Sequence, residues 1–517
     1  MKFLTVAWLA AVVSMTFVSC SDNGEDPDDK QDDVPYVWGT DGSIKTCDHL
    51  LFTAAGQEDV HGTVIGNGDK EFIFKGKQTL SKGTYTLRGW VYVADGAELT
   101  IEAGTVIKGE KESAASLIVE PGGKLYAEGS ASAPIVFTSA QSKGNRKPGD
   151  WGGLIICGSA LNNKGVLGQQ IEGGPRTKHG GNDATDNSGI LSYVRVEFAG
   201  YPFQKDKEIN GITFGSVGSG TQVDHLQVSY SNDDSYEWFG GNVNCRYLVA
   251  YNGWDDEFDT DNGFSGKVQF VLSVRDPRIA DTSQSNGFES DNDADGSLTE
   301  PFTSAVFSNV TFIGPKDREG FLNTPDYING GSYFPQNGSA LGKFQAAMQI
   351  RRSSQLACFN SVALGYPVGL IIDGEKGNTQ LIAKEGKLKL QNIFLAGMDI
   401  TGSDANKRYI DDLYDATGNQ VIDANAPSFS TTFFTAQPGN RVFSTTAELK
   451  LAADKNLTGA ADVAMFPADD SPLLGAAAFT DVALSTGFDK VTYVGAFDGK
   501  TNWLNGWTEF DPQNAEY

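Results

Sequence analysis

Cysteine and histidine are scarce in this sequence. Only 5 of its 517 residues are cysteine and 4 are histidine. No two cysteines stand at CxxC spacing and the histidines show no spacing typical of metal ligands, so a zinc site is not indicated. An oxidising compartment would allow a disulfide, but no spacing indicates one, and the pairing state stays open. Four cysteines follow residue 20, namely Cys47, Cys157, Cys245 and Cys358, and most of them are predicted to be small buried side chains in strands.

Positive charge and long apolar segments are also in short supply. The chain has 40 Lys and Arg against 66 Asp and Glu, a formal net charge of −26. This charge disfavours nucleic acid and anionic membrane surfaces as partners. No run of about 18 apolar residues follows the N-terminal region, so no transmembrane helix is expected in the mature chain. Glycine is abundant, at 61 residues, which suits a fold with many turns.

The first 40 residues are typical of an exported protein. Lys2 precedes the apolar run 3–13, and Ser19 stands before Cys20. This arrangement resembles a bacterial lipobox, which predicts a signal peptide over residues 1–19 and a lipid on Cys20; a secretory signal with an incidental cysteine is the alternative. Residues 20–40 are predicted to be an acidic, flexible tether. The acidic stretch resembles the surface-export signal of Bacteroidota lipoproteins, so we expect an outer-membrane, lipid-anchored protein at the cell surface; a spacer facing the periplasm is the alternative.

A period of 22 residues organises the middle of the chain. Two aromatic–acid pairs, Tyr236-Glu237 and Phe258-Asp259, stand 22 residues apart, among short apolar runs that no convincing amphipathic helix interrupts. The pattern predicts an all-β fold, a right-handed single-stranded parallel β-helix of about 22 residues per rung. A sandwich or a propeller is the alternative, although a propeller blade needs about 40–50 residues. We expect an N-terminal cap over 41–83, the β-helix over 84–390 and an irregular region over 391–517 whose last residues cap the open end.

Stacked rungs would bring the acids of this repeat into one outward column, with Tyr236 and Phe258 stacked on the inward face. The predicted members of the column are Glu237, Asp259, Glu289, Arg351 and Asp373. Carboxylates about 4.8 Å apart repel by roughly 3.5 kcal/mol at an effective dielectric constant of about 20. Solvent, a raised pKa, a basic side chain or a metal ion must offset this repulsion.

Calcium is the predicted partner of these acids, because Ca²⁺ binds oxygen ligands and one ion between two rungs can reach a carboxylate on each. Segment 291–296 also fits the first half of a calcium loop, D-x-D-x-D-G, although Phe302 stands where an EF-hand needs Glu. A solvated Asx-rich turn is the alternative. The predicted metal-binding residues are Asp259, Asp261, Glu289, Asp291, Asp293 and Asp295.

Two catalytic chemistries suit the same region. Paired acids suit glycoside hydrolysis, which needs two carboxyl groups at a set separation. Arg351 beside Ca²⁺ suits a β-eliminating lyase, in which the ion acidifies a uronate proton and a base removes it. The alternatives are acids that accept turn amides and an arginine that pairs with stacked acids. The candidate catalytic residues are Asp233, Asp234, Asp256 and Arg351, and the candidate ligand-binding residues are Glu237, Trp238 and Trp254, the tryptophans as platforms for sugar rings.

Longer motifs surround these residues: Gly149–Ile156, Asn187–Gly200, Ser229–Gly241, Gly253–Asp261 and Ser285–Asp293. They resemble motifs of a group of exported β-helix lipoproteins of Bacteroidota. At the level of the fold that group is similar to the pectate-lyase-like superfamily, which holds lyases, hydrolases and non-catalytic binders, so the resemblance implies no single reaction. We therefore expect a cell-surface protein whose calcium-binding face binds a glycan or another extracellular ligand; a calcium-dependent polysaccharide lyase or a glycoside hydrolase is the alternative.

Overall fold

The computed structural model describes most of the chain after residue 62. The described residues are 63–203, 208–321, 341–404, 427–452 and 466–517, together with the backbone of four short strands. They belong to one compact unit, Tyr36–Tyr517. The predicted signal peptide, Cys20 and most of the tether lie outside the described residues. None of the helices in the described ranges is both long enough and apolar enough to cross a membrane.

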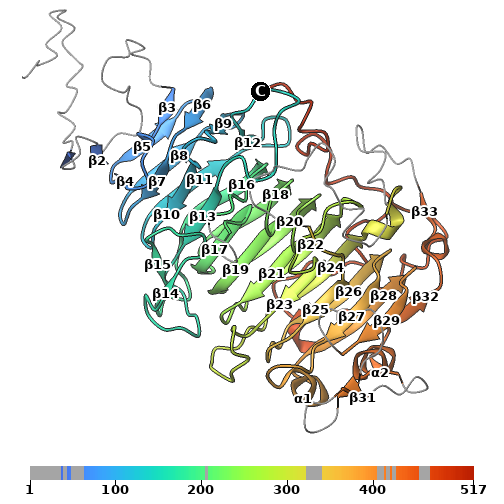
Figure 1. The fold of residues 1–517 in the computed structure, drawn as a ribbon. Coiled ribbons are helices and arrows are strands. Elements are labelled where there is room, and N and C mark those ends of the chain that lie inside the picture. The colour runs from blue at the N-terminus through green and yellow to red at the C-terminus, as the bar shows by residue number, and fades with distance from the viewer. Residues whose placement is uncertain are drawn as a thin grey trace, which may run out of the picture. The chain divides into compact units, whose positions relative to one another are not determined.

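Two long sheets of stacked strands form the fold (Figure 1). In the first sheet, of 13 strands, each strand pairs in parallel with the next rung, apart from the antiparallel pair at its start. Its strands are, in order, β1 (Val37–Trp38), β2 (Ile44–Cys47), β4 (Phe72–Phe74), β7 (Trp90–Val93), β10 (Ser116–Val119), β13 (Gly153–Cys157), β17 (Ile212–Val217), β19 (Tyr236–Gly241), β21 (Phe258–Asp261), β23 (Phe288–Ser290), β25 (Ala346–Ile350), β27 (Val368–Ile372) and β29 (Ile400–Ser403).

The second sheet contains 15 strands. Twelve follow one another as β3 (Val64–Ile65), β6 (Thr84–Leu87), β9 (Val106–Gly109), β12 (Ile135–Ser139), β16 (Gly189–Glu197), β18 (Gln222–Ser229), β20 (Asn244–Tyr251), β22 (Lys267–Val274), β24 (Val306–Ile313), β26 (Ala357–Leu364), β28 (Lys389–Ala396) and β32 (Arg441–Phe443). The other three are β5 (Lys77–Leu80), β8 (Glu98–Ile101) and β11 (Lys124–Glu128). The first half of β16 pairs with β11 and its second half with β12, so three-sided early rungs pass into two-sided later ones. The fold is the predicted right-handed parallel β-helix.

The remaining elements are short. They are the helices α1 (Thr379–Lys384) and α2 (Phe429–Ala436), the 3-10 turns Pro315–Asp317, Thr446–Leu449 and Val482–Leu484, and the antiparallel pairs β14 (Gln169–Gln170) with β15 (Lys178–His179), β30 (Leu413–Tyr414) with β31 (Gln420–Val421), and β33 (Leu451–Ala452) with β34 (Phe466–Pro467). None of them interrupts the two long sheets.

The solenoid starts earlier and ends later than its predicted limits of 84 and 390. Inside the predicted N-terminal cap, β4 and β5 already pair in parallel with β7 and β8. At the other end, β29 and β32 continue the two sheets. Helix α2 lies at that end, where the Ser430 hydroxyl donates to the Ser403 carbonyl (2.7 Å) and accepts from the Ile372 N–H (2.9 Å). The sequence pattern did not predict these rungs because their strands are short and, at the C-terminal end, are separated by a long insertion.

Each long strand of the second sheet bends at one left-handed residue. These residues, which we call the bend column, have φ between 49° and 60°: Tyr193, His225, Tyr247, Phe270, Asn309, Asn360 and Asn392. A left-handed conformation costs roughly 1–2 kcal/mol for a residue other than glycine. Contacts along the column offset this cost. The rings of Tyr193 and His225 stack 4.2 Å apart, and the Asn392 amide donates to the Asn360 side-chain oxygen at 2.7 Å.

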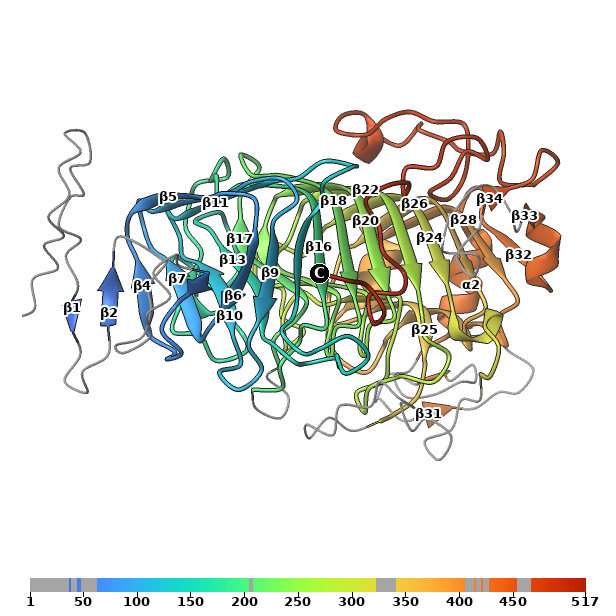
Figure 2. The ribbon, with the colours of Figure 1, turned by 90° about the horizontal axis from the view of Figure 1, so that it is seen from above.

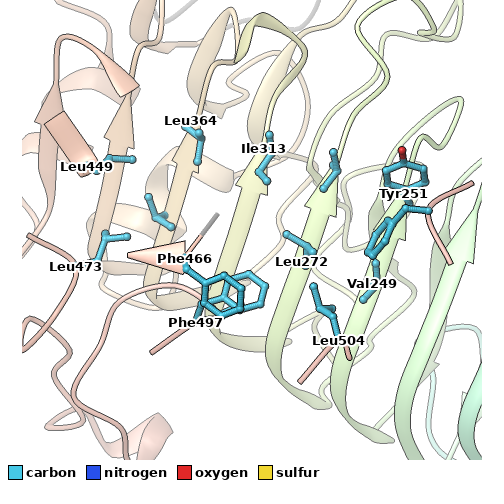
Figure 3. Packing of buried hydrophobic residues seen from close by; sticks show 14 of the residues in the cluster. Val249, Tyr251, Leu272, Ile313, Leu364, Leu449, Phe466, Leu473, Phe497 and Leu504 are labelled. Atoms are coloured by element: carbon cyan, nitrogen blue, oxygen red, sulfur yellow. The ribbon is translucent and has the colours of Figure 1, made fainter. Parts of the chain in front are cut away.

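A C-terminal strap, residues 466–517, runs back along the bend column and crosses the strands of the second sheet (Figure 2). The Asn309 amide donates to the Tyr493 carbonyl (2.9 Å), and the Trp507 ring meets the His225 ring edge-on at 5.6 Å. Apolar side chains of the strap, such as Phe497 and Leu504, pack on the same strands (Figure 3). The prediction that the last residues cap the open end is therefore wrong; the bend column binds them along the side of the solenoid.

Candidate functional site

The outer side of the first sheet changes from apolar to acidic along the solenoid and then becomes apolar again. Register between the strands aligns its outward side chains in one column: Ile155, Thr213, Glu237, Asp259, Glu289, Gln349 and Ile371. Three adjacent rungs therefore contribute acids, which confirms the 22-residue period for Glu237 and Asp259. Alternation along the strands turns Tyr236 and Phe258 inward as predicted, with their rings 5.4 Å apart and 11° from parallel.

Arg351 and Asp373 do not belong to this column, contrary to the prediction. Gln349 pairs with Glu289, and Arg351 follows two residues later, next to Asp291 in the neighbouring rung. Its guanidinium Nε donates to Asp291 at 2.9 Å, and its Nη2 pairs with Glu289. The period alone could not place it, because a long insertion separates the two rungs. Arg351 nevertheless supplies the acids with the charge partner that the sequence led us to expect.

The acids before the strands hold the turns of successive rungs together. The Asp234 Oδ1 accepts the backbone N–H of Asp256 at 2.8 Å, and the Asp256 Oδ1 accepts that of Asn286. Asn286 continues the ladder by accepting the Ala346 N–H at 3.0 Å. One carboxylate oxygen of each aspartate thus accepts a backbone N–H of the next turn. This is the role that the sequence offered as the alternative to catalysis for these residues.

Two overlapping groups of carboxylates have the geometry to hold a metal ion. One comprises Asp233, Asp234 and Asp255, the other Asp234, Glu237 and Asp259, and within each group the ligand oxygens lie within 4.8 Å of one another. Asp234 belongs to both. The Oδ1 atoms of Asp255 and Asp259 are buried without a hydrogen-bond partner. Within the described part of the chain, no salt bridge joins these five acids to a basic side chain.

We define the acidic face as these five acids together with Asp256, Asp261 and Glu289. Burial is the main cause that raises the pKa of Asp234, Glu237 and Asp259 well above the ordinary range, and neighbouring carboxylates raise it further. For Asp261, burial and then Asp291 raise the pKa to about 8. Ionisation of these acids is therefore disfavoured when no cation is bound.

The predicted calcium loop forms a turn in which Asp293 accepts backbone N–H groups of the loop itself. The Asp293 Oδ1 accepts the backbone N–H groups of Asp295 (2.9 Å) and Ser297 (3.0 Å). The Asp295 side chain is 90% exposed and lies 3.9 Å from Lys376. Of the six predicted metal-binding residues, only Asp259 belongs to either of the two groups of carboxylates described above. Asp291 and Glu289 bind Arg351, so the structure does not bring the six together.

Neither predicted tryptophan platform is available to a ligand. Trp238 and Trp254 are both fully buried (0% exposed). Trp238 stacks inside the solenoid between Phe214 (5.7 Å) and Phe264 (5.3 Å). Alternation could have revealed this, since a side chain next to the outward Glu237 in a strand must face inward. Glu237, in contrast, is on the acidic face as predicted, where it accepts a hydrogen bond from the Asn210 amide.

A cleft of about 620 Å³, which no sequence pattern predicted, opens beside the acidic face. Its lining combines the apolar side chains Ile171, Phe203 and Phe239 with Asp261 and Glu172. Segment 158–188 supplies most of this lining, and its Ile171 packs with Phe203 on the early rungs of the first sheet. No local motif marks this segment, because its position depends on packing against an outer apolar cluster that includes Trp90, Tyr92 and Ile155.

Comparison with known proteins agrees with this architecture. A family model described as a pectate-lyase like beta helix domain matches residues 73–435, well over half of the chain. No curated protein matches the chain significantly.

Proposed function

The chain belongs to the pectate-lyase-like β-helix family, and from this premise we propose that it binds a carbohydrate at its acidic face with the help of bound Ca²⁺. The observation that carries the proposal is the two overlapping groups of carboxylates, both of which contain Asp234. In these groups, one buried oxygen of Asp255 and one of Asp259 lack a hydrogen-bond partner. Carboxylate oxygens are the ligands that Ca²⁺ takes. The bound ion would neutralise the acids and offer coordination positions to sugar oxygens.

A non-catalytic role fits the surroundings of the acids better than a lyase. The candidate base, Arg351, is paired with Glu289 and Asp291. Burial lowers its pKa, but these two carboxylates outweigh burial and hold the pKa well above the usual value, so Arg351 cannot give up its proton near neutral pH. Asp234 and Asp256, in turn, are already engaged in the turn ladder.

A glycoside hydrolase is the second candidate. Asp234 and Asp256 lie in adjacent rungs, and burial followed by repulsion from neighbouring acids raises the pKa of both. A carboxyl group that keeps its proton is what general-acid catalysis of glycoside cleavage needs. Release of reducing ends from a glycan, abolished by Asp256→Asn, would favour this candidate. A new ultraviolet absorbance from uronate polymers would instead favour a lyase.

Asp234→Asn is expected to remove most of the cation binding. The change removes the negative charge of the one residue that belongs to both groups of carboxylates. It keeps the oxygen that accepts the Asp256 N–H, so the hydrogen bonds between the turns stay intact. In the unaltered protein, Ca²⁺ at about 100 times its Kd should stabilise the fold by about 2.7 kcal/mol. Thermal melting in chelator and in Ca²⁺, with calorimetric titration of the ion, measures both effects. Asp470→Asn, at an exposed acid paired with Lys450, is the matched control. Identical melting curves with and without Ca²⁺ would contradict the proposal.

We also propose that the protein is a lipoprotein anchored in the outer membrane through Cys20 and exposed at the cell surface, on the strength of the lipobox-like sequence. Cys20→Ala removes the thiol that would carry the lipid. The variant should therefore leave the membrane fraction, and the unaltered protein should be accessible to protease added to intact cells. Membrane retention of the Cys20→Ala protein would contradict lipidation at this residue.

A further inference from the structure

Amide side chains of the second sheet hold the backbone of the strap. Three pairs of residues make the contact: Gln227 with Glu509, Gln269 with Asp489, and Asn360 with Ala478. In each pair the side-chain oxygen accepts the backbone N–H of the strap residue at 2.8 Å. The side-chain NH2 donates to the carbonyl of the same residue, at 2.6, 2.8 and 3.1 Å in that order. Each amide therefore satisfies both backbone groups of one strap residue, as a neighbouring strand of a sheet does.

Two further amides complete this set, which we call the amide ladder. The Asn309 amide donates to the Tyr493 carbonyl at 2.9 Å, and the Asn392 amide donates to the Ala476 carbonyl at 2.7 Å. The five amides come from five strands along the solenoid, β18, β22, β24, β26 and β28, and each is at most 8% exposed. Hydrogen bonds to the main chain bind an extended segment whatever its side chains are. The amide ladder is therefore a site that recognises polypeptide backbone.

The strap has little regular structure of its own. In residues 466–517, all of which the structure describes, the regular elements are the two-residue strand β34, which pairs with β33, and the 3-10 turn Val482–Leu484. The solenoid determines the course of the strap instead. The amide ladder holds its backbone, and its Phe497 and Trp507 side chains are buried in one apolar cluster with Tyr251 and Leu272. The strap is thus ordered in the way that a bound peptide is.

Opposite charges fix the position of the strap on the sheet. Lys389 of the sheet pairs with Asp481 of the strap at 2.9 Å, and Arg246 pairs with Asp489 at 3.0 Å. Basic side chains of the sheet therefore face acids of the strap, in a chain whose net charge is −26. Complementary charges of this kind select a partner and its register. This face consequently fits an extended acidic polypeptide, and the strap of a second copy has the matching acids, apolar side chains and spacing.

From these contacts we infer that this face of the second sheet is a binding groove for an extended acidic polypeptide, and that the strap of a second copy can take the place of the resident strap. Residues 453–465 connect the strap to β33. Exchange between two copies keeps every contact of the amide ladder and both ion pairs, because each copy supplies the same groove and the same strap. The exchanged straps would join two copies without any new contact surface. This inference is independent of the carbohydrate-binding role proposed above.

Copies that differ only in mass test the exchange. A protease site inserted within residues 453–465 of the full chain, followed by cleavage, leaves the strap held by non-covalent contacts alone. Ordinary and heavy-isotope batches of the cut protein are then mixed a few degrees below the melting midpoint. Native mass spectrometry should show solenoids of one mass that carry straps of the other, and in uncut protein at high concentration the same mixing should give dimers of mixed mass. Loss of the strap on cleavage, or the absence of mixed-mass species in either preparation, would overturn the inference.

Altered strap backbones separate recognition by the amide ladder from apolar packing alone. A synthetic strap with N-methyl groups at Ala478, Asp489 and Glu509 lacks the three N–H groups that the ladder accepts. It should displace the resident strap from the cut protein at least about tenfold less effectively than the unmodified peptide. Glu509→Gln in the peptide keeps the N–H, so this matched control should displace the strap as the unmodified peptide does. On the solenoid, Asn360→Leu should weaken retention of the strap, whereas Gln380→Leu, at an amide of helix α1, should not. Equal displacement by the methylated and unmodified peptides would contradict the role of the ladder.

Discussion

Arg275→Met is expected to destabilise the fold by about 3–5 kcal/mol, the usual cost of leaving one partner of a buried ion pair without the other. The Arg275 and Glu257 side chains are both 0% exposed, with the Nη1 and Oε1 atoms 3.0 Å apart. Arg275 also donates to the carbonyls of Trp254 (3.2 Å) and Asp255. Methionine fills similar space but satisfies neither Glu257 nor the two carbonyls. Denaturant unfolding followed by circular dichroism measures the loss.

Two controls show whether the missing charge is responsible. In the double variant Glu257→Gln, Arg275→Met, the buried carboxylate is also gone, so part of the stability should return. Lys77→Met breaks an ion pair whose side chains are 69% and 35% exposed, and it should cost less than about 1 kcal/mol. A cost for Arg275→Met as small as that for Lys77→Met would show that the Glu257–Arg275 pair contributes little to the stability of the fold.

In the absence of a divalent cation, the fold is expected to lose stability as the pH rises from about 4 to about 8. Burial and mutual repulsion raise the pKa of Asp234, Glu237 and Asp259, and the pKa of Asp261 reaches about 8. In the unfolded chain such groups titrate near pH 4, so between these limits the folded state binds more protons than the unfolded state. Stability is therefore greatest below the unfolded pKa and falls as the pH rises through the folded pKa, by about 1.4 kcal/mol for each pKa unit of each group.

Added Ca²⁺ should flatten this profile, because the ion replaces the protons and binds best once the carboxyl groups are ionised. The stabilisation by Ca²⁺ should accordingly grow from pH 5 to pH 8. Chemical unfolding at several pH values, with chelator or with Ca²⁺, gives both slopes. In the double variant Asp234→Asn, Asp259→Asn, the profile should be flatter even in chelator. Stability of the unaltered protein that rises with pH in chelator would contradict this account of the acidic face.

The sequence was most informative where no insertion interrupts the period. Glu237 and Asp259 follow one another by a full rung without extra residues, so both their register and the inward position of Tyr236 and Phe258 could be predicted. Arg351 comes after a long insertion. There the spacing reflects loop length as well as rung length, which is why the prediction missed its register by two residues while its charge partnership with the acids was right.

The site itself was less predictable than the fold. Asp234 and Asp259 belong to the same group of carboxylates. Which of their oxygens face one another depends on the oxygens that accept turn N–H groups, and only the three-dimensional structure of the turn reveals this. For Asp293, a calcium-like spacing and an ordinary Asx turn have the same local sequence, and only the structure shows that its Oδ1 accepts two backbone N–H groups. The cleft could not be foreseen, since Phe203 and Glu172 come from loops whose course is set by packing on the first sheet.

The strap gives this solenoid a property that repeating folds usually lack. In most solenoids each repeat contacts only its neighbours, so rungs can form or fray one at a time. Here the Arg195 guanidinium donates to the Trp507 carbonyl across 312 positions of sequence, and the Tyr517 hydroxyl reaches Glu197 across 320. Such distant contacts raise the contact order and slow folding. They also link early and late rungs into one cooperative unit. The early rungs gain their last contacts only when the C-terminal strap packs against them.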